Sequence, residues 1–191
     1  DMLYILYDNE VYGLTKGQAG PTLGLGEKPK SLPRPSPQGK VNPLLLAFAS
    51  GYTWIARGYA YDVKGLKELI KEGIAHRGLA FLHVLQPCPT YNDLHTKEWF
   101  APRLYRLEEE GYDPLVPPGL PPEALEARMA RFQQKALEWG ERIPVGVFWK
   151  AELPTFEARL KAYLPRYPEA YPARGPETPL DLEGLLQEFA L

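Results

Sequence analysis

The first half of the chain shows three short apolar runs that are separated by polar stretches and by one amphipathic segment. The runs 2–7, 53–59 and 79–87 are rich in aromatic, β-branched and other apolar residues, which predicts three buried strands. Between the last two runs, apolar residues recur on one face of a predicted helix that Asp62 can cap and Gly78 can end. A strand, a helix and a strand joined by short links form a βαβ unit, which predicts a parallel sheet with helices packed on it.

Residues 13–43 interrupt this pattern because they are dense in glycine and proline. No regular element tolerates that density, so we expect a long loop. A loop of this length inside a compact domain is usually functional or disordered. The apolar run after it predicts a short buried helix over residues 43–51, which Gly51 ends.

The pattern changes from residue 93 onward. Residues 96–110 predict a helix that is broken near Pro102, and residues 122–139 predict a second helix with an apolar stripe that indicates core or subunit packing. The stripe consists of Leu125, Met129, Phe132, Ala136 and Trp139. One more strand is expected at 145–151. The fold class is therefore α/β, a parallel sheet flanked by helices, with a helical and irregular C-terminal extension.

Composition narrows the class of protein further. The chain has 22 basic and 24 acidic residues and a net charge of −2, so nothing indicates binding to nucleic acid or to an anionic membrane. Its apolar runs fall well short of the roughly 20 residues that span a bilayer. The one cysteine, Cys88, allows no disulfide within the chain, so a reducing, cytoplasmic setting is the default.

Two ends of the sequence carry expectations of their own. The chain begins at Asp1 and enters a predicted buried strand almost at once, so we expect sequence to be missing upstream. The tail beyond residue 164 is rich in proline and charge, and we expect it to wrap a partner or to stay loose.

Polar side chains follow the first strand in the segment 8–22, with the sequence DNEVYGLTKGQAGPT. Asp8 and Asn9 would stand at the carboxyl end of a strand, which is where open α/β sheets bind ligands. Magnesium prefers oxygen ligands and often shares them with a phosphate, and the glycines of the turn would let a diphosphate approach the backbone. From the residues alone, a simpler interpretation is favoured: an Asx-capped turn with a hydrophilic loop.

Cys88 lies between two prolines in the segment LQPCPTYN, residues 85–92. A lone cysteine after an apolar strand is more often an inert buried thiol, although so rigid a strand exit would suit a fixed metal ligand. The histidines His76, His83 and His95 show no metal-ligand spacing. We expect each to be structural or exposed, and His83 to be a hydrogen-bonded core residue.

The segments DNEVYGLTKGQ and LQPC resemble the β subunits of 2-oxoacid:ferredoxin oxidoreductases, and the resemblance is strong over roughly residues 1–95. It implies that the Asn9 side chain and the Val11 carbonyl bind magnesium, which holds thiamine diphosphate. It also implies that Gly13, Leu14 and Thr15 lie against the cofactor's diphosphate and ring-proximal region. Cys88 would be the last of four cysteine ligands of a [4Fe–4S] cluster.

The resemblance also implies a domain organisation and a set of partners. Residues 1–92 would be the C-terminal portion of a thiamine-diphosphate-binding domain, and residues 93–191 an extension packed on the same domain. The reaction implied is the oxidative decarboxylation of a 2-oxoacid such as 2-oxoglutarate or pyruvate, with coenzyme A and ferredoxin. The glutamate that activates the cofactor is expected on a partner α (pyrimidine-binding) subunit, so no catalytic residue is assignable here.

Two parts of the family's pattern are absent from this sequence. The Gly-Asp-Gly element and three further cysteines expected of the family would lie upstream, so we expect this chain alone to be inactive.

Alternatives to this interpretation stay open. A non-oxidative thiamine-diphosphate-dependent decarboxylase or synthase would use the Asn9 turn but leave Cys88 a plain thiol. A third possibility is a folded assembly fragment that is inactive because its cofactor loop is disordered.

Overall fold

The computed structural model describes residues 1–164, 166, 183, 184 and 187. Residues 1–153 form one compact unit, and residues from Pro154 onward belong to a second. In the second unit, α5 (Phe156–Tyr163) is capped by the Thr155 hydroxyl, which accepts from the amide of Ala158. Most of the tail beyond residue 164, for which we expected a wrapping or loose segment, lies outside the described residues. Within the described part of the chain, every helix is too short or too polar to cross a membrane.

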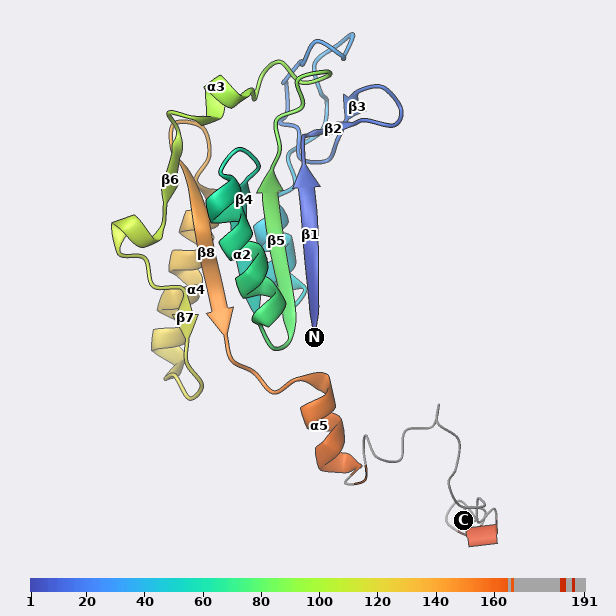
Figure 1. Ribbon diagram of the computed structural model, residues 1–191, viewed down its shortest axis with the longest axis vertical. Coiled ribbons are helices and arrows are strands. Elements are labelled where there is room, and N and C mark those ends of the chain that lie inside the picture. Colours follow the sequence, from blue (N-terminus) through green and yellow to red (C-terminus); the bar gives the residue numbers. More distant parts are fainter. Residues whose placement is uncertain (165, 167–182, 185–186, 188–191) are drawn as a thin grey trace. The chain divides into compact units, whose positions relative to one another are not determined.

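A six-stranded sheet forms the centre of the first unit (Figure 1). Its strand order is β1-β5-β4-β8-β6, and β7 also pairs with β8. The bounds of these strands are β1 Met2–Asp8, β4 Trp54–Tyr59, β5 Leu79–Leu85, β6 Leu104–Arg106, β7 Leu115–Val116 and β8 Ile143–Ala151. The strands β1, β5 and β4 are parallel, as the sequence predicted, whereas β8 runs antiparallel to β4.

Helices cover both faces of the sheet. On one face, α1 (Pro43–Ala49) and α4 (Pro122–Leu137) enclose a core in which Leu44, Phe132 and Phe148 are fully buried. On the other face, α2 (Val63–Ala75) packs its apolar stripe against Trp54 and Leu82. Burial on both faces explains why β4 and β5 read as nearly continuous apolar runs.

The helix predicted over residues 96–110 is wrong beyond its first turn. The segment forms the one-turn helix α3 (Lys97–Phe100), then strand β6, then a 3₁₀ turn at Glu108–Glu110. Pro102 has no amide hydrogen to continue the helix. The backbone after it instead pairs with β8, with Leu104 opposite Ile143. The predicted strand at 145–151 is confirmed and begins two residues earlier.

The long loop predicted over residues 13–43 is mostly irregular, as expected, but it opens with a small hairpin. Strand β2 (Val11–Tyr12) pairs antiparallel with β3 (Gln18–Ala19). Later in the loop, Leu23 and Ser36 are buried. The proposed boundary at residue 92 stays a prediction, and the sheet itself runs across it because β6, β7 and β8 follow it in the chain.

Candidate functional site

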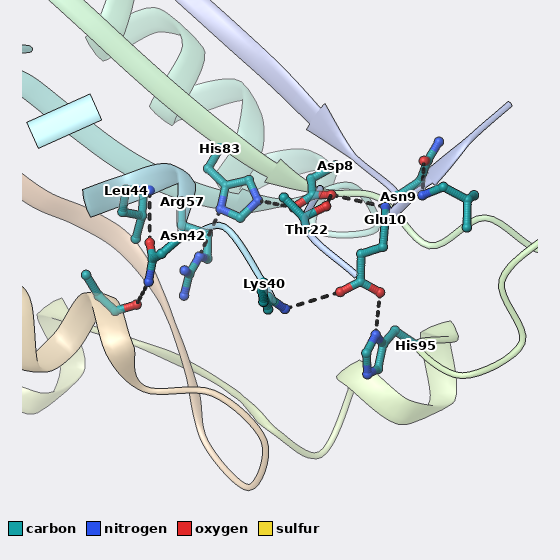
Figure 2. Close-up of polar contacts among 12 residues, drawn as sticks. Asp8, Asn9, Glu10, Thr22, Lys40, Asn42, Leu44, Arg57, His83 and His95 are labelled. Atoms are coloured by element: carbon teal, nitrogen blue, oxygen red, sulfur yellow. Dashed lines mark hydrogen bonds and ion pairs between the residues drawn. The ribbon is translucent and has the colours of Figure 1, made fainter. Parts of the chain in front are cut away.

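A network of buried polar side chains links strands β4 and β5 to the turn after β1 (Figure 2). Arg57 on β4 donates from Nε to Nδ1 of His83 on β5 at 3.2 Å. The Nε2 atom of His83 lies 2.8 Å from Oδ2 of Asp8, and the Thr22 hydroxyl donates to Oδ1 of Asp8. Because a guanidinium can only donate, Nδ1 of His83 accepts, and the hydrogen on Nε2 therefore points at Asp8.

Burial sets the charge states in this network. Burial acts to raise the pKa of the Asp8 carboxyl, but hydrogen bonds from His83, the Thr22 hydroxyl and the Glu10 amide hold that pKa below its usual value. Burial lowers the pKa of His83 against the opposing hydrogen bond to Asp8, so the ring is neutral near pH 7. Burial lowers the pKa of Arg57 to about 10, which is still high enough for the guanidinium to stay charged near pH 7. A buried cation and a buried anion are thus connected through a neutral imidazole.

This network confirms that His83 is a hydrogen-bonded core residue. Sequence reasoning gave Arg57 no chemistry, because a lone arginine on an apolar strand carries no spacing signal. Its guanidinium also donates to the carbonyl of Pro144 at 3.4 Å and lies over the rings of Trp139 and Phe148. The result is a rigid base for the turn that begins at Asp8.

The turn after β1 is fixed by its own hydrogen bonds. The side-chain oxygen of Asn9 accepts from the amide of Val11 at 3.1 Å, and the carbonyl of Glu10 accepts from the amide of Gly20 at 2.8 Å. Val11 is buried and pairs with Ala19. Glu10 has a φ of 66°, a left-handed conformation that few residues other than glycine adopt. The Asn9 side chain and the backbone oxygens of the turn are therefore held in one arrangement.

Gly13, Leu14 and Thr15 form the exposed tip of the same turn. The Leu14 side chain is 98% exposed. A Cβ atom added to Gly13 would meet nothing within 4 Å, so the backbone there is open to a ligand. The amide of Lys16 donates to the carbonyl of Gly13 at 3.1 Å and closes the tip. The structure thus places these three residues on the outer side of the turn, beyond Asn9.

A cavity of about 510 Å³ lies beside β1 and α1. Its lining includes the polar residues Asp8, Asn9, Glu10 and Thr22. Its other walls are largely apolar and include Tyr4, Leu6, Pro43, Ala47 and Phe81. Its size falls in the range of small-molecule sites, and the carboxyl end of β1 opens directly onto it.

Glu10 is the centre of a buried cluster that sequence reasoning missed (Figure 2). Its side chain is 5% exposed and accepts a hydrogen bond from Nδ2 of Asn92 at 3.0 Å. Nδ1 of His95 contacts the same carboxylate oxygen, and Nζ of Lys40 lies 3.3 Å from the other oxygen. The Lys40 ammonium also lies 3.2 Å from the centre of the Trp139 ring. Burial lowers the pKa of Lys40, and the charge of Glu10 opposes that shift.

Three potential metal ligands meet in this cluster. One ligand atom from each of Glu10, Glu27 and His95 lies within 4.8 Å of the others. Carboxylate and imidazole groups are common metal ligands. Lys40 is nevertheless already paired with Glu10, and its ammonium supplies the positive charge that a bound cation would bring. These residues therefore form an ion cluster around the buried Glu10.

Cys88 lies in the loop after β5 and is half-buried. Its carbonyl accepts from the amide of Asn92 at 3.0 Å. Because β1 and β5 are adjacent and parallel, with Asp8 opposite Leu85, the loop of Cys88 and the turn of Asn9 leave the sheet at the same end. Two segments that the sequence singled out separately are thus neighbours in space.

The donors at this end of the sheet fit part of a magnesium-diphosphate site and one corner of an iron–sulfur cluster. Asn9 offers a side-chain oxygen and Val11 a main-chain carbonyl, and magnesium is bound by oxygen ligands that it usually shares with phosphate and water. One thiolate matches one of the four that a [4Fe–4S] cluster takes. The remaining ligands of both groups must come from residues outside this set.

Two family models match the chain. The model of the C-terminal TPP-binding domain of thiamine pyrophosphate enzymes matches residues 1–84. The model of the C-terminal part of pyruvate ferredoxin oxidoreductase β subunits matches residues 88–164. Together with the parallel strands and the turn at their carboxyl ends, these matches define the class: the C-terminal part of a thiamine-pyrophosphate-binding α/β domain.

Individual relatives narrow the class. The chain is 57% identical over 176 residues to a 2-oxoacid:ferredoxin oxidoreductase β subunit of Sulfolobus sp, a match that covers 91% of the chain and 57% of that relative. It is 50% identical over 197 residues to the corresponding subunit of Saccharolobus solfataricus, with 98% and 63% covered. A solved 2-oxoglutarate:ferredoxin oxidoreductase from Magnetococcus marinus superposes with a TM-score of 0.72 at 27% identity, and covers 100% of this chain and 58% of its own.

The chain belongs to the family of 2-oxoacid:ferredoxin oxidoreductase β subunits. This confirms the resemblance that the motifs DNEVYGLTKGQ and LQPC carried. The chain spans only 57% to 63% of the length of the two relatives.

Proposed function

We propose that this chain contributes the Asn9 turn to a thiamine diphosphate site, and Cys88 to a [4Fe–4S] cluster, in a 2-oxoacid:ferredoxin oxidoreductase. The observation that carries the proposal is the meeting of the two segments at one end of the sheet. The turn and the cysteine loop leave adjacent strands and are hydrogen-bonded to each other through Asn92. A cofactor that releases electrons and a cluster that accepts them have to be close neighbours.

The reaction we propose is the oxidative decarboxylation of a 2-oxoacid, such as 2-oxoglutarate or pyruvate, with coenzyme A. It yields an acyl-CoA, carbon dioxide and reduced ferredoxin. The Magnetococcus marinus relative was solved with 2-oxoglutarate, coenzyme A and succinyl-CoA bound, which supports this substrate class. Thiamine diphosphate, when bound, supplies the electron sink for decarboxylation. An α (pyrimidine-binding) subunit would complete the site and provide the activating glutamate, and the assembly would work in the cytoplasm.

In this proposal the Asn9 side chain and the Val11 carbonyl bind magnesium. Gly13, Leu14 and Thr15 lie against the diphosphate and the ring-proximal part of the cofactor. The open space around Gly13 supports this role, because a ligand can approach the backbone there without meeting a side chain. The buried bond between Asp8 and His83 holds the start of the turn in place.

The thiolate of Cys88 binds one iron atom in this proposal. Pro87 and Pro89 restrict the backbone on either side of it, which suits a ligand that must not move. A non-oxidative thiamine-dependent decarboxylase or synthase is the alternative, with Cys88 a plain thiol. The identity of 57% to a ferredoxin-linked relative favours the oxidative enzyme.

The test uses the complete complex purified without oxygen. Cys88→Ala should remove iron, cluster absorbance and ferredoxin reduction, while thiamine diphosphate still binds. Cys88→Ser should retain a weakened cluster, because an alkoxide is a poor ligand. Thr90→Ala, an exposed substitution in the same loop, is the matched control and should behave as wild type. Wild-type iron content in Cys88→Ala would show that Cys88 is only a thiol and would favour the non-oxidative alternative.

A further inference from the structure

Asn92 uses its polar groups on both sides of the proposed site. Its backbone amide donates to the carbonyl of Cys88 at 3.0 Å. Its side-chain nitrogen donates to the carbonyl of Asn9 at 3.3 Å and to the carboxylate of Glu10 at 3.0 Å. Asn92 is 2% exposed, so these bonds are shielded from water. One buried residue therefore contacts the backbone of the cysteine loop and the backbone of the cofactor turn.

The remaining oxygen of Asn92 shapes its own loop. It accepts from the amide of Leu94 at 3.0 Å and from the amide of His95 at 3.4 Å. The second of these places His95 against Glu10, whose left-handed backbone belongs to the cofactor turn. The amide oxygen of Asn92 therefore orders the loop after Cys88, and the amide nitrogen attaches that loop to the turn.

The long loop over residues 13–43 also contacts the segment after β5, nearer the surface. Nζ of Lys30 donates to the carbonyl of Pro89 at 2.9 Å, and the amide of Lys30 donates to the carboxylate of Asp93 at 2.6 Å. Both bonds are exposed, so water can replace them at low cost. The buried side-chain nitrogen of Asn92 has no such replacement, so it holds the two segments together more strongly than Lys30 does. It acts beside two further contacts between them, the pair of His95 with Glu10 and the bond from the Gln86 amide to the Asp8 carbonyl at 2.9 Å.

We propose that Asn92 is a positioning residue that couples the cofactor turn, which contains Asn9, to the cysteine loop, which contains Cys88. This inference rests on the proposed function, in which Asn9 and Cys88 are ligands. Loss of the Asn92 side-chain donor should therefore weaken the binding of magnesium and thiamine diphosphate and change the environment of the cluster at the same time. Partners that orient metal ligands have such effects elsewhere, with losses of roughly 10- to 100-fold in affinity.

The decisive substitution is Asn92→Asp in the complete complex. It keeps the oxygen that accepts from Leu94 and His95, but it replaces the donor with an oxygen that faces Glu10 and the Asn9 carbonyl. We expect the affinity for thiamine diphosphate, titrated with magnesium present, to fall about tenfold or more. The electron paramagnetic resonance spectrum of the reduced cluster should also shift, at unchanged iron content. Thr90→Ala should change neither measurement.

A second variant separates positioning from folding. In Asn92→Asp combined with Glu10→Gln, the new amide at position 10 can donate to the new carboxylate at position 92. The bond between the side chains at positions 92 and 10 is restored with its direction reversed. Both measurements should therefore return part of the way toward wild type, because the donor to the Asn9 carbonyl and the charge that pairs with Lys40 are still missing. If Asn92→Asp lowers the yield of folded complex, Asn92→Ser takes its place, since its hydroxyl can still accept from the loop amides.

The outcomes separate the inference from the proposed function. Asn9→Ala and Cys88→Ala are measured in parallel, and wild-type cofactor affinity and iron content in both would defeat the proposed function itself. If those two variants lose cofactor and cluster while Asn92→Asp matches Thr90→Ala, only the inference is overturned. A change confined to the cofactor or confined to the cluster would equally overturn it, because Asn92 would then serve one segment alone.

Discussion

His83 and Asp8 are 75 residues apart in the chain, yet Nε2 of one lies 2.8 Å from Oδ2 of the other in the interior between β1 and β5. His83→Leu would leave the carboxylate of Asp8 and the guanidinium of Arg57 buried without their shared partner. We expect it to cost about 3 kcal/mol of unfolding free energy, since an unpaired buried charge is expensive. His83→Gln, whose amide can still donate to Asp8, should cost about 1 kcal/mol. Urea denaturation would measure both, and equal losses would contradict this account of the network.

Asn42 joins two helices. Its side-chain oxygen caps α1 by accepting from the amides of Leu44 and Leu45, and its nitrogen donates to the carbonyl of Ala136 near the end of α4 at 2.7 Å. Asn42→Ala loses both interactions and should destabilise the chain by about 2 kcal/mol. Asn42→Ser keeps a capping hydroxyl, is too short to reach the Ala136 carbonyl, and should cost about half as much. Thermal or chemical unfolding that ranks the two variants in the opposite order would exclude this division of roles.

His76 at the end of α2 predicts a dependence of stability on pH. Burial lowers its pKa, as does the ammonium of Lys150, while Glu72 and Glu152 oppose the shift. Unfolded chains therefore bind a proton near pH 6.5 that the folded state binds only at lower pH. Stability should fall as the pH drops through about 6.5 and level off below the folded pKa, with a slope of at most about 1.4 kcal/mol per pH unit from this group.

The control for this pH dependence is His76→Gln. Glutamine keeps a polar group near the Thr53 hydroxyl, which lies 2.8 Å from Nε2 of His76, but it does not titrate. The variant should show a flatter profile than wild type between about pH 6.5 and the folded pKa. Parallel profiles for the two proteins would show that His76 titrates normally.

Asn9→Ala tests the proposed magnesium ligand in the complete complex. It removes a side-chain oxygen, and the affinity for thiamine diphosphate at limiting magnesium should fall about tenfold or more. Asn9→Asp keeps an oxygen at the same place and should retain most of the affinity. Unchanged activity of Asn9→Ala at limiting cofactor would remove Asn9 from the site.

The loop over residues 13–43 should respond to assembly. Leu14 at its tip is 98% exposed and Leu25 is 70% exposed, so the loop presents apolar surface that a partner could bury. Ordering backbone costs about 1–2 kcal/mol per residue, which contacts to the cofactor and a facing subunit would offset. Amide hydrogen exchange in the loop should therefore slow on assembly with magnesium and thiamine diphosphate. Protection that is already high in the chain alone, and unchanged in the holoenzyme, would identify a rigid structural loop instead.

Strands β1, β4 and β5 and helix α2 could be predicted from the sequence because their signals are local. The strands are apolar along most of their length, and α2 begins at a residue that does cap it, since the carboxylate of Asp62 accepts from the amide of Gly65 at 3.0 Å. Residues 104–106 could not be predicted in this way. Their conformation is set by pairing with a strand about 40 residues later in the chain, where Leu104 meets Ile143.

The site divides along the same line. Asn9, Val11 and Cys88 could be recognised from the sequence because each lies in a short motif, and their roles stay predictions. The cluster around Glu10 could not be recognised from the sequence, because Asn92 and His95 are 82 and 85 residues away along the chain. Its formation also depends on the left-handed backbone of Glu10, for which a glutamate gives no warning.

Strand β8 pairs with the side of β4 that β5 leaves free, although it comes from the C-terminal half of the chain and every ligand proposed here precedes it. Without β8, the amides and carbonyls along that side of β4 would have no sheet partner. An open strand edge of this kind is a template onto which a strand from another molecule can add. The later half of the chain thus has a task apart from chemistry: through β8 it covers one side of β4, where a strand of another molecule could otherwise add.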